Sequence, residues 1–151
     1  MFYPIGILKH FIAKRAMAKS LKDEATEDFL EILLDLMKLT FLIDEGYRQD
    51  LKDFIGSYRF KDKDGKVNVL VKFHDGKMEI SEDPVPEPNV MVTFKDSNAL
   101  RRFLLSCKKD ILNVILNNEI QVTGNFNYLY KFGFMANHPI QPLLNLENEL
   151  T

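Results

Sequence analysis

Cysteine and tryptophan are the scarcest residues of this 151-residue chain, which holds one cysteine and no tryptophan. A single cysteine excludes an intramolecular disulfide framework and a cysteine-based zinc site. It also favours a reducing compartment, so we expect a cytoplasmic protein. Neither charge sign is in excess, because 20 basic and 22 acidic residues leave a formal net charge of −2. That balance argues against general nucleic-acid binding, which needs a basic surface.

Long apolar runs are missing as well. The longest apolar region, Phe29–Ile43, is interrupted by Glu31, Asp35 and Lys38 and is too short to cross a membrane. The first residues lack the basic start and the small-residue cleavage site of a secretory signal. The last residues do not form a peroxisomal address. We therefore expect neither a membrane span nor a targeting segment.

Motifs of catalysis and metal binding are absent from the sequence. His10, His74 and His138 lie in three separate predicted elements, and no HxH or HExxH spacing occurs. Cys107 is followed by Lys108 and Lys109 but has no histidine nearby in sequence. There is no nucleophile elbow, P-loop or GxGxxG. These absences predict a protein that is not an enzyme and that holds no metal or cofactor.

Phenylalanine is abundant instead, with twelve residues in the chain. Aromatic side chains bury large areas, so twelve of them indicate either a large core or an apolar cavity. The chain is long enough for one domain with a proper core. Composition does not separate a filled core from an open cavity.

The first 22 residues carry five basic residues and no acid, which leaves 15 basic and 22 acidic residues in the remainder. The pattern predicts a basic helix with apolar residues on it. Such a helix suits peripheral contact with an anionic membrane. It equally suits packing on the domain with its lysines pointing outward, because Arg15 falls between Leu8 and Phe11 on a helical projection.

The next 24 residues predict a second, much more apolar helix. Thr26 is a plausible N-cap and Gly46 a plausible C′ residue. Between them only Glu31, Asp35 and Lys38 make a polar stripe. A helix this apolar must be covered on most sides. Its cover is either the rest of the chain or a second copy, which makes residues 26–46 a candidate surface for a homodimer or a partner.

Beyond a polar connector or short helix over 47–54, the apolar period changes from helical to alternating. Asp64-Gly65 and Asp75-Gly76 are strong hairpin signals between alternating segments. Three strands joined by two such turns predict an antiparallel meander. The expected strands are 56–61, 67–73 and 77–80.

The second half begins with a connector over 81–89 that holds three prolines. A strand over 90–94 follows, then a helix capped by Asp96 or Ser97, and a second short helix around 111–116. Residues 120–123 alternate as a strand that breaks at Gly124-Asn125, a pair that tolerates positive φ. An aromatic-rich helix over 126–135 comes next. The tail from residue 137, with its two prolines, predicts a weak last turn or a flexible end.

This order from residue 58 to about 135 resembles the sterol carrier protein type-2 family. Four segments carry the resemblance: YRFKDKDG, VKFHDGKMEI, VMVTFKDSNALRRFL and NNEIQVTGNFNYLYKF. None of them is catalytic, and their order and spacing make the match. Asn118 stands where the family usually has a glycine before the strand. The N-terminal part is also longer than the single helix that the family usually carries there.

The resemblance implies an α+β fold, with a five-stranded, mainly antiparallel sheet, helices covering one face and a helical N-terminal extension. We expect residues 1–50 to form that extension and residues 51–151 the sterol-carrier-like domain. Between sheet and helices the family has an apolar tunnel for fatty acyl chains, sterols or isoprenoid-like lipids. The candidate wall residues are Phe94, Leu100, Phe103, Leu104, Ile111, Ile115, Phe126, Leu129, Tyr130 and Met135.

Two functions follow from this interpretation. The first is non-enzymatic binding of a hydrophobic ligand for transport or presentation. The second is an accessory or scaffold role in a lipid-modifying pathway, such as quinone biosynthesis, with the helix of residues 26–46 recruiting a partner or a second copy. Peripheral membrane contact through residues 1–22 is compatible with either function.

Overall fold

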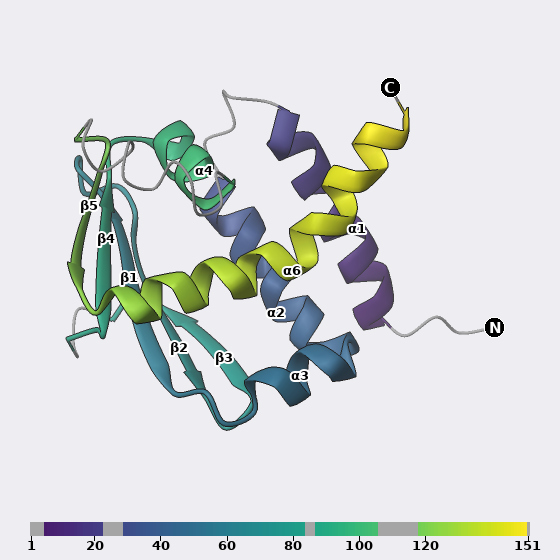
Figure 1. Ribbon diagram of the computed structural model, residues 1–151, viewed down its shortest axis with the longest axis horizontal. Coiled ribbons are helices and arrows are strands. Elements are labelled where there is room, and N and C mark those ends of the chain that lie inside the picture. Colours follow the sequence, from purple (N-terminus) through teal and green to yellow (C-terminus); the bar gives the residue numbers. More distant parts are fainter. Residues whose placement is uncertain (1–4, 23–28, 84–86, 106–117, 151) are drawn as a thin grey trace.

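The computed structural model describes residues 5–22, 29–83, 87–105 and 118–150. It is an α+β fold in which helices lie on one side of a five-stranded sheet (Figure 1). The helices are α1 (Ile5–Lys22), α2 (Phe29–Ile43), α3 (Glu45–Leu51), α4 (Ser97–Leu105) and α6 (Phe126–Leu150). The strands are β1 (Gly56–Asp62), β2 (Asn68–His74), β3 (Lys77–Ser81), β4 (Val90–Phe94) and β5 (Ile120–Gly124).

The sheet has the strand order β3-β2-β1-β4-β5. The pairs β1–β2 and β2–β3 are antiparallel, as the two Asp-Gly hairpins predict, and the pair β4–β5 is antiparallel as well. The central pair β1–β4 is parallel, so the sheet is mixed. β4 thus lies on the side of β1 that β2 leaves free and runs in the same direction as β1.

The tight turns have the backbone conformations that their sequences favour. Asp75 and Gly76 both have positive φ, of 51° and 70°, as a two-residue hairpin of the primed type requires. Gly124 has a φ of 116°, and a Cβ added to it would lie 2.2 Å from the carbonyl oxygen of Asn89. Only glycine fits at that position. Asn118, in place of the family's glycine, adopts φ 60°, which asparagine tolerates better than most residues.

The helices form two layers over the sheet (Figure 1). α2, α4 and α6 lie nearest the strands, and α1 is outermost, packed on α2 and α6. The most apolar helix, α2, is central, with Phe29, Leu33, Leu36 and Met37 all fully buried. The rest of the chain therefore supplies most of the cover that this helix needs. Among the described residues, no helix combines the length and the apolarity needed to cross a bilayer.

The predicted end of the second helix is wrong. Gly46 does not follow α2 but lies inside α3, and α2 ends at Ile43. Asp44 separates the two helices, and its carboxylate accepts a hydrogen bond from the backbone N–H of Tyr47 at 3.0 Å. A carboxylate N-cap stabilises the start of a new helix. The second helix therefore ends before Asp44 and not at the glycine two residues later. The expected N-cap, Thr26, lies outside the described residues.

The predicted weak tail is also wrong, because α6 continues through Pro139 and Pro142 to Leu150. Pro139 cannot donate to the carbonyl of Met135, four residues earlier. The Tyr47 hydroxyl donates to that carbonyl instead, at 2.8 Å. Figure 1 shows the helix changing direction in its second half, as prolines in a helix commonly cause. Burial of Ala136, Ile140 and Leu143 fixes this half to the core.

Other local predictions are confirmed. The Asp96 carboxylate caps α4 by accepting from the backbone N–H of Ala99 at 2.8 Å. α6 has an N-cap that the sequence analysis did not predict, because the side-chain oxygen of Asn125 accepts from the N–H of Asn127 at 2.9 Å. The short helix expected around 111–116 lies outside the described residues.

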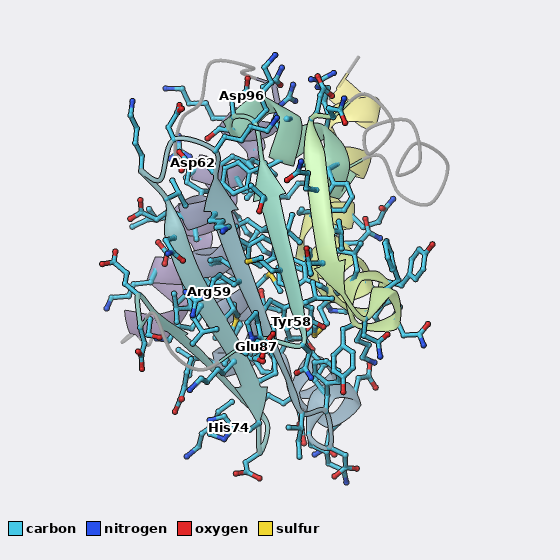
Figure 2. The ribbon with its side chains drawn as sticks, turned by 90° about the vertical axis from the view of Figure 1, so that its left-hand side faces the viewer. Tyr58, Arg59, Asp62, His74, Glu87 and Asp96 are labelled. Atoms are coloured by element: carbon cyan, nitrogen blue, oxygen red, sulfur yellow. The ribbon has the colours of Figure 1, made fainter. Side chains whose placement is uncertain are left out.

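The sheet face away from the helices carries a buried charge, seen in Figure 2. Arg59 is only 6% exposed and donates to the side-chain oxygen of Asn68 and to the carbonyl of Asp83, both at 2.8 Å. The guanidinium thus ties β1 to β2 and to the start of the connector. Buried charges need such partners.

Candidate functional site

A cleft of about 480 Å³ lies between the first half of α2 and one end of the sheet. Its volume falls within the range of roughly 300–1,000 Å³ that small-molecule sites have. It sits where β2 begins, β3 ends and α4 starts. Its lining consists of Leu30, Glu31, Leu34, Asp35, Lys66, Val67, Asn68, Val69, Ile80, Ser81, Glu82, Phe94 and Ser97.

The floor of the cleft is apolar because an apolar face of α2 and an apolar face of the sheet meet there. Leu30 and Leu34 are one helical turn apart on α2, and both are buried. Val67 and Val69 lie before and within β2 with the spacing of two that places side chains on one face. The remaining floor residues are Ile80 and Phe94. Such a floor suits a hydrocarbon chain.

The rim of the cleft is polar and mostly acidic. Glu31 and Asp35 of α2 and Glu82 after β3 are exposed, as is Lys66 in the turn before β2. Three carboxylates and one ammonium give this rim a net negative charge at neutral pH. Asn68, Ser81 and Ser97 add neutral polar groups.

The centre of the space between sheet and helices is filled. Tyr58 and Phe60 of β1 lie 5.1 and 4.9 Å from the ring of Phe132 in α6, measured between centroids, and all three are fully buried. The Tyr58 hydroxyl donates to the carbonyl of Tyr128 at 2.7 Å, and burial raises the pKa of this phenol well above its ordinary value. Among the described residues, these three rings fill the interior between β1 and α6, whereas the cleft lies at one end of the sheet.

The predicted wall residues separate into three groups. Phe94 is the one described member that lines the cleft. Leu100, Phe103, Leu129 and Met135 are buried in the core around it. Phe126 and Tyr130 lie on the outer side of α6, 46% and 55% exposed. The remaining three are Leu104, whose side chain is not described, and Ile111 and Ile115, which lie outside the described residues. Ligand contact by these ten residues stays a prediction.

The sequence interpretation missed most of the cleft. Leu30, Leu34, Val67, Val69 and Ile80 were all visible as apolar positions of a helix or a strand. Periodicity assigns a residue to an apolar face, but it does not say whether that face meets side chains or a space. The placement of α2 over the start of β2 decides this, and it is a tertiary contact.

A second, more open groove of about 660 Å³ lies between α1 and α2. Ile12 and Leu42 line it and are 58% and 63% exposed. The neighbouring Phe11 is also 58% exposed. The other lining residues are Lys9, Ala13, Ala16, Ile32, Asp35, Lys38 and Leu39. This groove faces away from the sheet.

The titratable groups with shifted pKa values lie away from the cleft. Burial, with help from Lys14, lowers the pKa of His10. A hydrogen bond from His138 lowers the pKa of Asp44, and hydrogen bonds to Glu79 and Asp75 raise the pKa of His74. Within the described residues, no three His, Cys, Asp or Glu side chains gather in a way that would hold a metal ion.

No family model matches the sequence, and neither does any curated protein. Among solved structures, the chain is similar to UbiJ-SCP2, a ubiquinone synthesis protein, with a TM-score of 0.53 and 15% identity over 68% of this chain and 84% of that one. It is also similar to a double mutant of the sec-alkyl sulfatase PisA1, with a TM-score of 0.56 and 16% identity.

The likeness to the sulfatase covers 73% of this chain but only 16% of the enzyme. The sterol-carrier-like unit is thus a small part of that protein, whose wild-type form comes from Pseudomonas sp.. At these identities the likeness shows the fold. The predicted resemblance to the sterol carrier protein type-2 family is confirmed at that level, since the chain has the sterol carrier protein type-2 fold.

Proposed function

We propose that this chain binds a hydrophobic ligand without chemically changing it, for transport or presentation. The observation that carries the proposal is the cleft between α2 and β2, with its apolar floor and polar rim. The ligand would be a fatty acyl chain, a sterol or an isoprenoid-like lipid, with its apolar part on the floor and its head group at the rim.

The energetics support an apolar ligand. Each Å² of apolar surface removed from water contributes about 25 cal/mol, so a chain that covers roughly 200 Å² gains about 5 kcal/mol before the cost of association. Leu30, Leu34 and Phe94 supply a firm surface because each is less than 10% exposed. A few polar groups at the edge are enough to orient an amphiphile.

The proposal excludes a catalytic role for the chain by itself. The similar sulfatase is an enzyme, but this fold makes up 16% of its length, so its activity does not transfer with the fold. The polar side chains of the described lining are three carboxylates, a lysine, an amide and two serines, and this described set holds no histidine or cysteine. That set lacks a nucleophile with an adjacent histidine base.

The groove between α1 and α2 favours a second function, in which the chain is an accessory protein that docks on another surface through this groove. The core-facing side of α2 is covered within this chain, so the surface that remains for docking is the groove and not the whole of residues 26–46. We propose an anionic membrane surface as the occupant. Ile12 and Leu42 are exposed in its lining, which also holds two lysines, Lys9 and Lys38, against the single acid Asp35. Residues 1–22 carry no acid. In this view α1 and the outer side of α2, within residues 1–50, carry the docking surface, and residues 51–151 form the ligand-binding domain together with the α2 residues that line the cleft.

The ligand proposal is tested by organic extraction of the purified protein followed by mass spectrometry, together with titration of the stripped protein with a fluorescent fatty alcohol. We expect an extracted lipid in near-stoichiometric amount, or saturable uptake of the probe at one site. An empty protein that also fails to take up the probe would overturn the proposal.

Docking is tested separately by co-sedimentation with vesicles of phosphatidylcholine containing 30% phosphatidylserine. We expect wild-type protein to sediment with them and the variant Ile12→Glu/Leu42→Glu to stay in the supernatant. Analytical ultracentrifugation without vesicles detects the competing occupant. If the wild-type protein is a dimer and this variant is a monomer, a second copy of the chain occupies the groove and the membrane proposal is wrong.

A further inference from the structure

The ionisable side chains at the rim of the cleft are mostly acidic. Of the four ionisable side chains that the described lining holds, three are carboxylates: Glu31, Asp35 and Glu82. The fourth is Lys66. No ion pair among the described residues joins any two of them. The rim therefore presents a negative potential to whatever head group lies above the apolar floor.

We propose that the cleft binds amphiphiles with a cationic head group, that is long-chain amines, in preference to fatty acids of the same length. The proposal rests on the ligand-binding function given above and names its ligand class. The alkyl chain lies on Leu34, Val69 and Phe94. The ammonium group lies at the rim, within the field of the three carboxylates.

Two helix starts at the cleft act in the opposite direction, and they are weaker. α2 and α4 both begin at its lining, and a helix N-terminus carries about half a positive charge. Each is already met by a carboxylate of this chain. Glu31 lies in the first turn of α2, and Asp96 caps α4 by accepting from the N–H of Ala99. Full carboxylate charges therefore set the sign of the rim.

A fatty acid would bring a fourth carboxylate to this rim, where Lys66 is the one basic side chain of the described lining and the two helix starts are already met by carboxylates. A long-chain alcohol would neither gain nor lose from the rim charge. A long-chain amine stays protonated at neutral pH, because primary amines have pKa values near 10. The expected order of affinity is therefore amine above alcohol above acid. Because the rim is exposed, its field is screened, and the preference falls as salt rises.

The test is calorimetric titration of the delipidated full chain with decylamine, decanol and decanoate, each below its aggregation concentration, at pH 7. We expect decylamine to bind at least tenfold more tightly than decanoate in low salt, with the ratio shrinking in 0.5 M NaCl. The variant Glu31→Gln/Asp35→Asn/Glu82→Gln should bring the ratio close to one. The variant Lys66→Gln should increase it.

A control variant removes the same number of charges away from the cleft. Glu45, Asp50 and Asp53 are exposed around α3, at the other end of the sheet in Figure 1. Glu45→Gln/Asp50→Asn/Asp53→Asn should keep the wild-type ratio. If it loses the preference as fully as the rim variant does, net charge is the cause and the proposal fails. Decanoate or decanol binding as tightly as decylamine also overturns the charge proposal but leaves the ligand-binding function intact. Failure of all three ligands to bind overturns both.

Discussion

The hydroxyl of Tyr47 donates a hydrogen bond to the carbonyl oxygen of Met135, 2.8 Å away and 88 residues later in the chain. That carbonyl is the one that Pro139 leaves without its helical N–H donor. Tyr47 is 3% exposed, and burial raises the pKa of its phenol far above the ordinary value, so the hydroxyl keeps its proton at any physiological pH. A side chain of α3 thus replaces a missing backbone donor in α6.

This relationship predicts a specific coupling. Tyr47→Phe should lower the free energy of unfolding by about 1–2 kcal/mol, because it leaves a buried carbonyl unpaired while keeping the ring. In a Pro139→Ala background the alanine N–H can donate to Met135, so the same substitution should cost less than half as much. Urea unfolding of the four proteins measures the coupling. Equal costs in both backgrounds would show that the hydroxyl does not stand in for the proline's missing donor.

Gly124 predicts a large effect at the point where β5 passes into α6. Its φ of 116° is unfavourable for other residues, and an added Cβ would lie 2.2 Å from the Asn89 carbonyl oxygen. Gly124→Ala should therefore cost roughly 3 kcal/mol or more. Gly65→Ala is the matched control, because Gly65 also has positive φ but nothing lies within 4 Å of the added Cβ. It should cost about 1–2 kcal/mol. Similar costs at both sites would contradict the steric argument.

Filling the cleft should abolish ligand binding without unfolding the protein. Val69 is half-buried on the cleft floor and pairs with Phe60 in the β1–β2 register. Val69→Trp adds a large side chain on the open side, so we expect affinity for a fluorescent fatty alcohol to fall at least tenfold. Tyr130→Ala, on the exposed side of α6, should change it less than twofold. If Tyr130→Ala weakens binding more than Val69→Trp, the ligand lies along α6 and not in the cleft.

The sequence predicted those parts of the fold that local chemistry determines. Asp75-Gly76 specified its hairpin, Asp96 capped its helix, and Gly124 adopted positive φ, because each depends on residues close in sequence. The extent of α6 depended on Tyr47, which lies 88 residues from the carbonyl that it satisfies. A proline in a helical pattern argues for an end unless such a distant donor is known.

The candidate site was less predictable for a related reason. Tyr130 and Phe126 looked suitable for a cavity because they are aromatic and follow the Gly124-Asn125 turn, yet both are exposed on α6. Leu30 and Leu34 looked like ordinary core residues of α2, yet they border a space. Which apolar face remains uncovered depends on how α2 packs against the sheet. The apolar pattern of one sequence does not reveal that packing.

Because His10 is buried in its neutral form, we expect the folded protein to lose stability in mild acid. It is 8% exposed, and its Nε2 lies 3.3 Å from the Thr40 hydroxyl oxygen. The Thr40 hydroxyl donates its one proton to the carbonyl of Leu36 at 2.7 Å, so its oxygen accepts from His10. A neutral imidazole with the proton on Nε2 satisfies this pair. Burial and the nearby Lys14 disfavour the charged form, which lowers the pKa of His10 below its ordinary 6.5.

A lowered histidine pKa means that the unfolded chain takes up the proton first as the pH falls. The contribution of neutral His10 is fully present above pH 6.5 and is lost as the pH falls through the lowered folded-state value. His10→Leu should therefore unfold at a urea midpoint that changes less than the wild type's between pH 7.5 and pH 5. The contribution of His74 to stability changes with pH in the opposite direction, because Glu79 and Asp75 raise its pKa. His74→Ala should make the loss in acid steeper, and a His10→Leu protein that loses as much stability as the wild type over this range would contradict the assignment.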